Sequence, residues 1–341
     1  MKKSLMTLGV LALFVLMAYG QEKKFALYSV AFYNMENLFD TIHDEGKNDY
    51  EYLPNGTNQW NTMKYKAKLK NMSEILSMLS TDKFPRGPAI IGVSEIENYR
   101  VLEDILKQPA LADRGYQYVH YEGADQRGVD CAFFYNPKLF ELTNSKLVPY
   151  VYINDTVHKT RGFLIASGNI AGEKMHFIVN HWPSRAAASP ARERAGEQVR
   201  VIKDSLLRED SAAKIVIMGD MNDDPMDKSM AVALGAKRKP ADVGPTDLYN
   251  PWWDTLKKGY GTLMYKGKWN LFDQIVFTGN LLGTDRSTLK FYKHEIFRRD
   301  FMFQKEGKYK GYPKRTQAGG VWLNGYSDHL PTIIYLIKEV K

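Results

Sequence analysis

Short runs of apolar residues, separated by polar turns, recur along the chain from residue 25 to its end. Runs of this kind that are rich in Val, Ile, Phe and Tyr are typical of β-strands. They predict strands at residues 25–33, 88–93, 116–120, 129–135, 162–167, 174–179, 214–218, 271–277 and 332–337.

Two longer segments, residues 64–79 and 190–208, carry apolar residues at three- and four-residue spacing, which is the pattern of an amphipathic helix. The apolar positions are Leu69, Met72, Leu76 and Leu79 in the first segment, and Val199, Ile202 and Leu206 in the second. Ser189 and Pro190 add a cap and a first-turn proline to the second helix. Many strands with few helices between them predict a mixed-sheet α/β sandwich rather than a regular alternation of strand and helix.

The N-terminal residues have the composition of a secretory signal peptide. Two lysines precede a nearly continuous apolar stretch, residues 5–17, and small residues follow it. We therefore expect residues 1–20 to be a signal peptide, Gln21 to be the mature start, and the protein to be secreted or periplasmic. The alternative is a membrane anchor, but the stretch is short for a spanning helix, which needs about 20 residues. No Cys lies near the cleavage point, so a lipid anchor is not supported either.

The composition permits a large folded core and gives weak hints about partners. Apolar residues make up 44% of the 341 residues and aromatic residues 13%, which excludes a globally disordered chain. The formal net charge of +8 favours acidic partners such as nucleic acid, although 39 acidic residues are interspersed with the basic ones. The lone cysteine, Cys131, cannot form an internal disulfide, and its apolar neighbours predict a core residue.

Polar residues with catalytic potential follow several of the predicted strands. Asp220 and Asn222 come after the strand at 214–218, and Glu95 and His181 each follow another strand in the same way. A calcium-binding loop starting at Asp220 is excluded, because Pro and Ala stand where such a loop requires Gly and Glu. Taken alone, each of these residues is also compatible with an ordinary acidic turn or a structural histidine.

The same arrangement recurs at other strands. The residues are Asn34 and Glu36 after the first strand, Arg127 and Asp130 leading into the strand at 129–135, and Asp328 and His329 before the last strand. Asp273 lies inside an apolar stretch, where a carboxylate needs a partner such as a protonated histidine. Catalytic and binding residues are often found on loops that a rigid sheet positions, so we expect these side chains to form a catalytic site.

The set of residues suits hydrolysis without a protein nucleophile. The chain contains no GxSxG elbow, P-loop, HExxH or CxxC motif. A hard divalent cation such as Mg²⁺ prefers carboxylate oxygens as ligands. A further carboxylate then activates water, and a histidine balances the developing charge.

In this order the residues resemble the endonuclease/exonuclease/phosphatase superfamily, which includes deoxyribonuclease I, exonuclease III-type repair nucleases, sphingomyelinases and inositol polyphosphate phosphatases. The resemblance rests on Asn34, Glu36, Glu95, His181, residues 219–222, Asp273 and residues 327–331, which span nearly the whole mature chain. It implies an α/β fold, a four-layer sandwich of two mixed β-sheets flanked by helices, with the site at one edge. It also implies that residues 21–341 form a single domain of this family.

The resemblance implies a role for each candidate residue. Glu95 is implied as the principal ligand of Mg²⁺ or Mn²⁺, with Glu36 and Asp328 beside it. The residues expected to contact the substrate phosphate are Asn34, Arg127 and Asn222.

The remaining roles concern proton transfer and charge. Asp220 would orient or deprotonate the attacking water. His329 would contact the scissile phosphate and be oriented by Asp273. His181 would be the second histidine, as in deoxyribonuclease-like members, and we suggest Asp130 as the residue that orients it.

The function that follows is a secreted metal-dependent phosphodiesterase, an endonuclease-type hydrolase of nucleic acid. A phosphatase or a sphingomyelinase-like phospholipid phosphodiesterase is the alternative on the same catalytic core. An inactive phosphate-binding module is an alternative of another class. We expect no stable membrane anchor, and the sequence predicts no oligomeric state.

The best pointer to the substrate is a basic and aromatic segment, residues 301–315. It contains Lys305, Lys308, Lys310, Lys314 and Arg315 interleaved with Tyr309 and Tyr312, and Arg298 and Arg299 precede it. Such a segment suits contact with a nucleic-acid backbone and stacking on bases. An ordinary solvated loop is the alternative.

Overall fold

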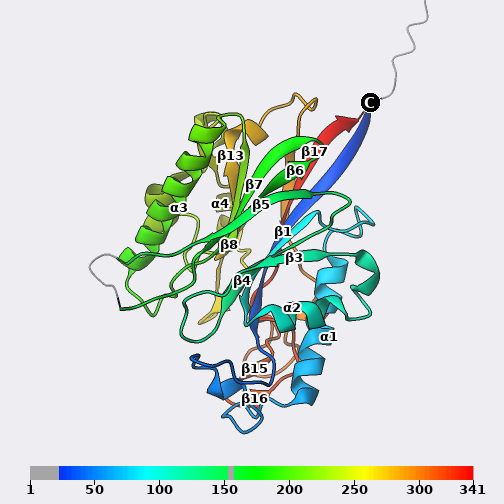
Figure 1. The fold of residues 1–341 in the computed structure, drawn as a ribbon, viewed down its shortest axis with the longest axis vertical. Helices are drawn as coiled ribbons and strands as arrows, with labels where there is room; N and C mark the ends of the chain where they lie inside the picture. The colour runs from blue at the N-terminus through cyan, green and yellow to red at the C-terminus, as the bar shows by residue number, and fades with distance from the viewer. Residues whose placement is uncertain (1–22, 153–156, 341) are drawn as a thin grey trace, which may run out of the picture.

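The computed structural model describes residues 23–152 and 157–340 of the chain. Two large mixed β-sheets dominate it (Figure 1). In spatial order, the first sheet contains β14 (Lys290–Ile296), β17 (Thr332–Val340), β1 (Lys24–Leu38), β2 (Ile90–Ile96), β4 (Asp130–Tyr135) and β3 (Gln117–His120). The second contains β5 (Glu141–Val148), β6 (Phe163–Ile170), β7 (Glu173–His181), β8 (Lys214–Asp220), β13 (Asp273–Thr278), β10 (Leu248–Tyr249) and β9 (Ala236–Lys237). Every strand predicted from the sequence is present.

Each sheet buries side chains on both of its faces. Val30 of β1 packs into a core between the two sheets, and the next residue, Ala31, packs on the opposite face. Val216 and Ile217 of β8 alternate in the same way. Strands buried on both faces read as continuous apolar runs, which is why their positions could be predicted.

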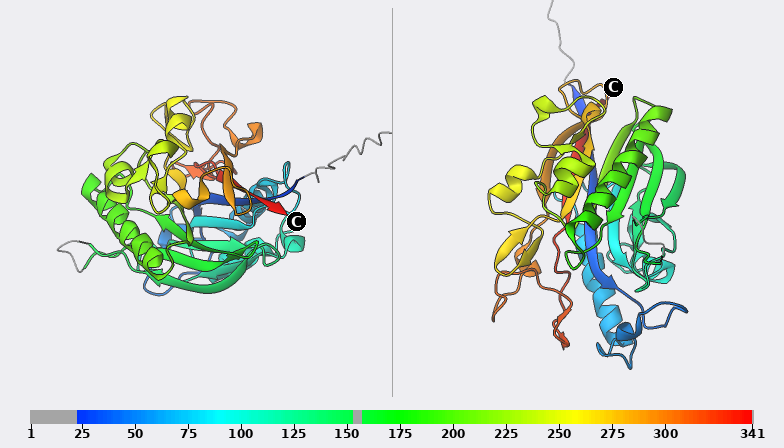
Figure 2. Two further views of the ribbon diagram at one scale, coloured as in Figure 1. Left: turned by 90° about the horizontal axis from the view of Figure 1, so that it is seen from above. Right: turned by 90° about the vertical axis from the view of Figure 1, so that its left-hand side faces the viewer.

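Helices cover the two outer faces. α1 (Thr62–Met78) and α2 (Tyr99–Leu106) pack against the first sheet, and α3 (Ser189–Glu209) packs against the second. Figure 1 shows α3 at one side of the molecule and α1 and α2 at the other, and Figure 2 shows α3 beside the strands of the second sheet. The order helix, sheet, sheet, helix confirms the predicted four-layer sandwich.

Several elements were not predicted. β5 and β14 lie at sheet edges and contain several polar residues, so they lack a continuous apolar run. Asn98 caps the start of α2, and its side chain accepts hydrogen bonds from the backbone amides of Arg100 and Val101. The smaller elements are α4 (Trp253–Lys257) and two hairpins, β11 (Leu263–Tyr265) with β12 (Lys268–Asn270) and β15 (Gln317–Ala318) with β16 (Val321–Trp322).

Two parallel strand pairs determine where the polar residues meet. β1 runs parallel to β2, and β7 runs parallel to β8, where His181 pairs with Asp220. β13 is antiparallel to β8, so its first residue, Asp273, also lies opposite Asp220. Gly219 permits the close approach of β7 and β8, because a Cβ there would lie 2.3 Å from the Asn180 carbonyl oxygen. The ends of these strands therefore share one edge of the sandwich.

Two further expectations concern the ends and the core. The predicted signal peptide lies outside the described residues, so its cleavage stays a prediction. Among residues 23–152 and 157–340, no helix is long and apolar enough to cross a membrane. Cys131 is a buried core residue, as predicted, and burial raises the pKa of its thiol.

Candidate active site

A polar cavity of 460 Å³ lies at the shared edge of the strands, and we call it the catalytic cavity. Six of the predicted site residues line it: Glu95, Arg127, His181, Asp220, Asn222 and His329. The unpredicted Arg161 lines it as well. Residues from the ends of several strands, in both sheets, thus face one small volume.

Glu95 and Asp220 form the acidic centre of the cavity. The Asn34 amide joins them, because its Nδ2 donates to Glu95 Oε1 at 3.1 Å and to Asp220 Oδ2 at 3.0 Å. His181 Nε2 lies 3.6 Å from Glu95 and 3.7 Å from Asp220. Ligand atoms of Glu95, His181 and Asp220 all lie within 4.8 Å of one another. The carboxylate of Glu95 at this centre is an oxygen ligand that fits a hard divalent cation such as Mg²⁺ or Mn²⁺.

The backbone at the acidic centre is strained in a way that directs side chains inward. Glu95 has φ +58°, and the β2 register shifts at this residue, which marks a bulge. Asn222 has φ +52°. Non-glycine residues in this region are uncommon, and such strain is concentrated at functional sites.

Asp220 is poised to exchange a proton near neutral pH. Burial raises the pKa of this carboxyl to about 7, and the charges of Asp273 and Glu95 add to the effect against the opposing charge of His329. A buried carboxylate with a pKa near neutrality suits general-base chemistry.

The two histidines have opposite electrostatic environments. His329 Nδ1 lies 2.7 Å from Asp273 Oδ2, and both side chains are buried. Burial alone would lower the pKa of His329, but the charges of Asp273 and Asp220 outweigh it and hold the pKa well above the usual value. Burial, together with the nearby Arg161, Arg127 and His329, lowers the pKa of His181 well below the usual value. His329 is therefore the charged imidazolium, and His181 is the neutral imidazole.

Carboxylates and two histidines around one cavity suit general-base hydrolysis, and the family of the chain is shown by its similarity to known sequences. A sequence profile described as "Endonuclease/Exonuclease/phosphatase family" matches residues 29–338, nearly the whole chain. The chain belongs to the endonuclease/exonuclease/phosphatase family. Members of this family are metal-dependent phosphoric ester hydrolases, and the protein is an enzyme of this class. A search of curated proteins found no match.

Solved structures of this family share the fold at low sequence identity. One is an endonuclease/exonuclease/phosphatase family protein from Bacteroides thetaiotaomicron, with 15% identity, a TM-score of 0.58, and coverage of 93% of this chain and 97% of that one. A B. thetaiotaomicron mannosyl-6-phosphatase has 14% identity, a TM-score of 0.56, and coverage of 91% and 99%. D. rerio TDP2 complexed with a single-strand DNA product has 14% identity, a TM-score of 0.52, and coverage of 91% and 99%.

Two of the predicted metal ligands, Glu36 and Asp328, are held by an arginine that the sequence analysis did not place in the site. Arg315 Nε donates to Glu36 Oε1 at 2.8 Å, and its Nη2 lies 2.8 Å from Asp328 Oδ2. Burial and the charge of Asp328 raise the pKa of Glu36 to about 7, against the opposing charges of Lys68 and Arg315. The acidic residues of this family member thus form two neighbouring groups, one around Asp220 and one around Arg315.

The residues predicted to contact phosphate lie at different depths. Asn34 is buried between the carboxylates, while Arg127 is half exposed at the wall of the catalytic cavity. The backbone nitrogen of Asn222 donates to Asp220 Oδ1 at 2.9 Å, and the side-chain Nδ2 donates to the Trp182 carbonyl at 3.0 Å. These positions are compatible with the predicted roles, which stay predictions.

The suggested pairing of Asp130 with His181 is corrected by the structure. Asp130 Oδ2 lies 3.2 Å from His120 Nε2 and accepts a hydrogen bond from the Gly123 amide at 3.0 Å. β4 pairs with β3, so the Asp130 side chain reaches the histidine at the end of that neighbouring strand. His181 Nδ1 has no hydrogen-bond partner among the described atoms.

Two further residues support the site although no role was predicted for them. Arg161 is buried, and its guanidinium lies 2.9 Å from Asp125 Oδ2 and donates to the Trp182 carbonyl at 2.9 Å. Its position directly before a predicted strand was the only available signal. Ser327 Oγ donates to the Asn34 carbonyl at 2.8 Å and accepts from the His329 amide at 3.0 Å, which ties the two parts of the site together.

Proposed function

We propose that this protein is a secreted phosphoesterase that hydrolyses its substrate with water activated by Asp220, in the presence of Mg²⁺ or Mn²⁺. The observation that carries the proposal is the convergence of Glu95, His181, Asp220 and His329 on one cavity. A bound divalent cation would polarise the phosphate, and Glu95 would hold it, with His181 beside them as the second histidine of the site.

Each of the other catalytic residues has a separate role in this reaction. Asp220 accepts the proton of the attacking water, and Asn34 and Asn222 keep its carboxylate in place. The His329 imidazolium lies where negative charge grows on the phosphate, and Asp273 fixes the orientation of its ring. Arg127 contacts the phosphate at the mouth of the cavity.

Two substrate classes have specific support. Nucleic acid is supported by the Lys and Tyr residues of the segment 301–315, and the similar TDP2 structure contains a single-strand DNA product. A phosphate ester of a small alcohol is supported by a second, larger cavity beside the catalytic one, and a similar fold serves a mannosyl-6-phosphatase.

The proposal is tested with purified protein that starts at Gln21. Release of product from DNA, RNA, sphingomyelin, inositol phosphates and hexose phosphates should require Mg²⁺ or Mn²⁺ and should stop in EDTA. Full activity in excess chelator would overturn the metal-dependent mechanism. Detection of this mature N-terminus in the exported protein tests the secretion part of the proposal, and an uncleaved N-terminus would contradict it.

A further inference from the structure

A cavity of 980 Å³, which we call the outer cavity, adjoins the catalytic groups. Glu36, Asn37 and Asp328 line it on the side of the active site. The Asn37 amide donates to Glu95 Oε2 at 3.0 Å, and Asp328 Oδ1 lies 3.9 Å from His329 Nε2. The outer cavity therefore offers space for the ester group of a phosphate held by the catalytic residues. The volume is at the upper end of the range for small-molecule sites, about 300–1,000 Å³.

Aromatic rings form much of the outer cavity. Tyr265 of the β11–β12 hairpin and Tyr309 of the segment 301–315 line it, and these residues are 62% and 51% exposed. Tyr52 and the buried Trp60 also belong to its lining, with ring centroids 5.9 Å apart. The Tyr312 hydroxyl accepts a hydrogen bond from the Gly267 amide at 2.6 Å, which joins the hairpin to the segment 301–315. The exposed rings of Tyr265 and Tyr309 offer flat apolar faces against which a ring-shaped ligand can stack.

The charges of the outer cavity argue against a polyanionic ligand. Its carboxylates are Glu36, Glu51, Glu306 and Asp328, and its cations are Lys266, Lys308 and Arg315. Arg315 is already paired with Glu36 and Asp328, so only the two lysines remain to meet added negative charge. A nucleic-acid groove needs an excess of Lys and Arg over acidic residues, because each phosphate must be neutralised.

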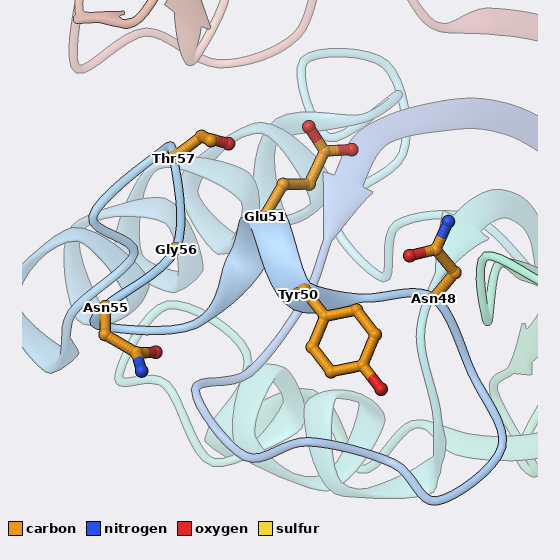
Figure 3. Close-up of a pocket in the computed structure, with 6 residues that line it drawn as sticks. All are labelled: Asn48, Tyr50, Glu51, Asn55, Gly56 and Thr57. Carbon is orange, nitrogen blue, oxygen red and sulfur yellow. The ribbon is translucent and has the colours of Figure 1, made fainter.

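Carboxylates accept hydrogen bonds but do not donate them, so a ligand that suits this cavity must bring donors. Glu51 is one such acceptor. It lines both the outer cavity and a neighbouring pocket of 450 Å³ formed by residues 48–57. Figure 3 shows that the Glu51 and Tyr50 side chains project in different directions from this segment. An uncharged ring that carries several hydroxyl groups satisfies both the carboxylates and the aromatic faces.

We propose that the outer cavity binds the sugar ring of a phosphorylated carbohydrate, whose phosphate ester is cut in the catalytic cavity. The inference rests on the proposed function. In the reaction, the water oxygen forms a bond to phosphorus and the ester P–O bond breaks. The proton taken by Asp220 balances the one gained by the sugar oxygen, so sugar and inorganic phosphate are the products.

The first test compares the 6-phosphates of glucose, mannose and galactose with glycerol 3-phosphate, which has the same phosphate but no ring, and with a single-stranded DNA oligonucleotide. Tyr265→Ala and Tyr309→Ala should each raise the KM of the best hexose phosphate by about tenfold, with kcat nearly unchanged, because stacking is lost. The KM for glycerol 3-phosphate should not move. Tyr292→Ala is the matched control, because Tyr292 is similarly exposed but lies on β14, outside the lining of the outer cavity.

Equal kcat/KM for glycerol 3-phosphate and every hexose phosphate would overturn the inference, and so would a preference for the oligonucleotide. A second measurement separates this failure from a failure of the proposed function. Calorimetric titration of the Asp220→Asn protein with hexose phosphates should show binding that Tyr265→Ala weakens. If hexose phosphates bind but no substrate is hydrolysed, only the proposed function is overturned. If hexose phosphates do not bind, the sugar site is overturned.

Discussion

Replacing Asp273 with Asn tests whether this carboxylate sustains the charge of His329. The two groups are 2.7 Å apart, Asp273 is fully buried and His329 is 6% exposed. Asn keeps the size of the side chain but removes its charge. Burial by itself lowers the pKa of His329, and the charge of Asp273 opposes this effect. Without that charge the pKa of His329 should fall.

The size of the loss in kcat follows from the charge-assisted hydrogen bond that Asp273→Asn removes. A hydrogen bond to a charged group contributes about 1.5–3 kcal/mol, and each 1.36 kcal/mol corresponds to about a tenfold change in rate. The variant should therefore lose about 10- to 100-fold in kcat at neutral pH. The alkaline limb of its pH–rate profile should move to lower pH, because the imidazolium deprotonates earlier.

The pH dependence of folding stability provides an independent test of the charge on His329. The pKa of His329 is raised in the folded state. Its contribution to stability is therefore complete below the unfolded-state value of about 6.5 and is lost as the pH rises through the folded-state value. Urea denaturation of the wild type should show this loss, and Asp273→Asn should show much less of it. An unchanged alkaline limb, or a kcat restored by additional metal, would show that Asp273 is a ligand or a structural residue instead.

Three further predictions concern the surrounding groups. Glu95→Gln should weaken Mg²⁺ binding at least about tenfold in calorimetric titration, because a charged ligand is lost, and an unchanged affinity would contradict its role. Since burial and neighbouring carboxylates raise the pKa of Asp220 to about 7, kcat should fall on the acid side with a midpoint no higher than about pH 7, and a rate that rises toward acid pH would contradict this. Lys68→Met should destabilise the fold by about 3 kcal/mol in urea, because buried Lys68 donates to Thr316 Oγ1 and to the Tyr326 carbonyl, whereas exposed Lys66→Met should have little effect. Equal stability of these two variants would refute the structural role of Lys68.

The sequence predicted the inner strands because their environment leaves a simple pattern. β8 is buried on both faces, so its residues read as an unbroken apolar run that ends in a carboxylate. β5 and β14 lie at edges, where the residues are at most half-buried and polar side chains interrupt the apolar run. The sandwich as a whole followed from the family resemblance and from the order of the motifs.

The site was predictable where a residue follows a strand and unpredictable where contacts cross long stretches of chain. Asp220, Glu95 and His181 mark strand ends and meet in space for that reason. Arg315 reaches Glu36 across 279 positions, and no local pattern indicates which basic residue of the segment 301–315 turns inward. The partner of Asp130 was wrong because the sequence does not show that His120 lies on the adjacent strand.

The central claim is that Asp220 activates water for the attack on a phosphate ester in the catalytic cavity. Its most direct test measures phosphate or product release by Asp220→Asn at saturating Mg²⁺, with metal binding followed by calorimetry and folding by urea denaturation. The account predicts a loss of turnover of about 100-fold or more in a folded protein that still binds the metal. Turnover near that of the wild type on the same substrate would contradict the account.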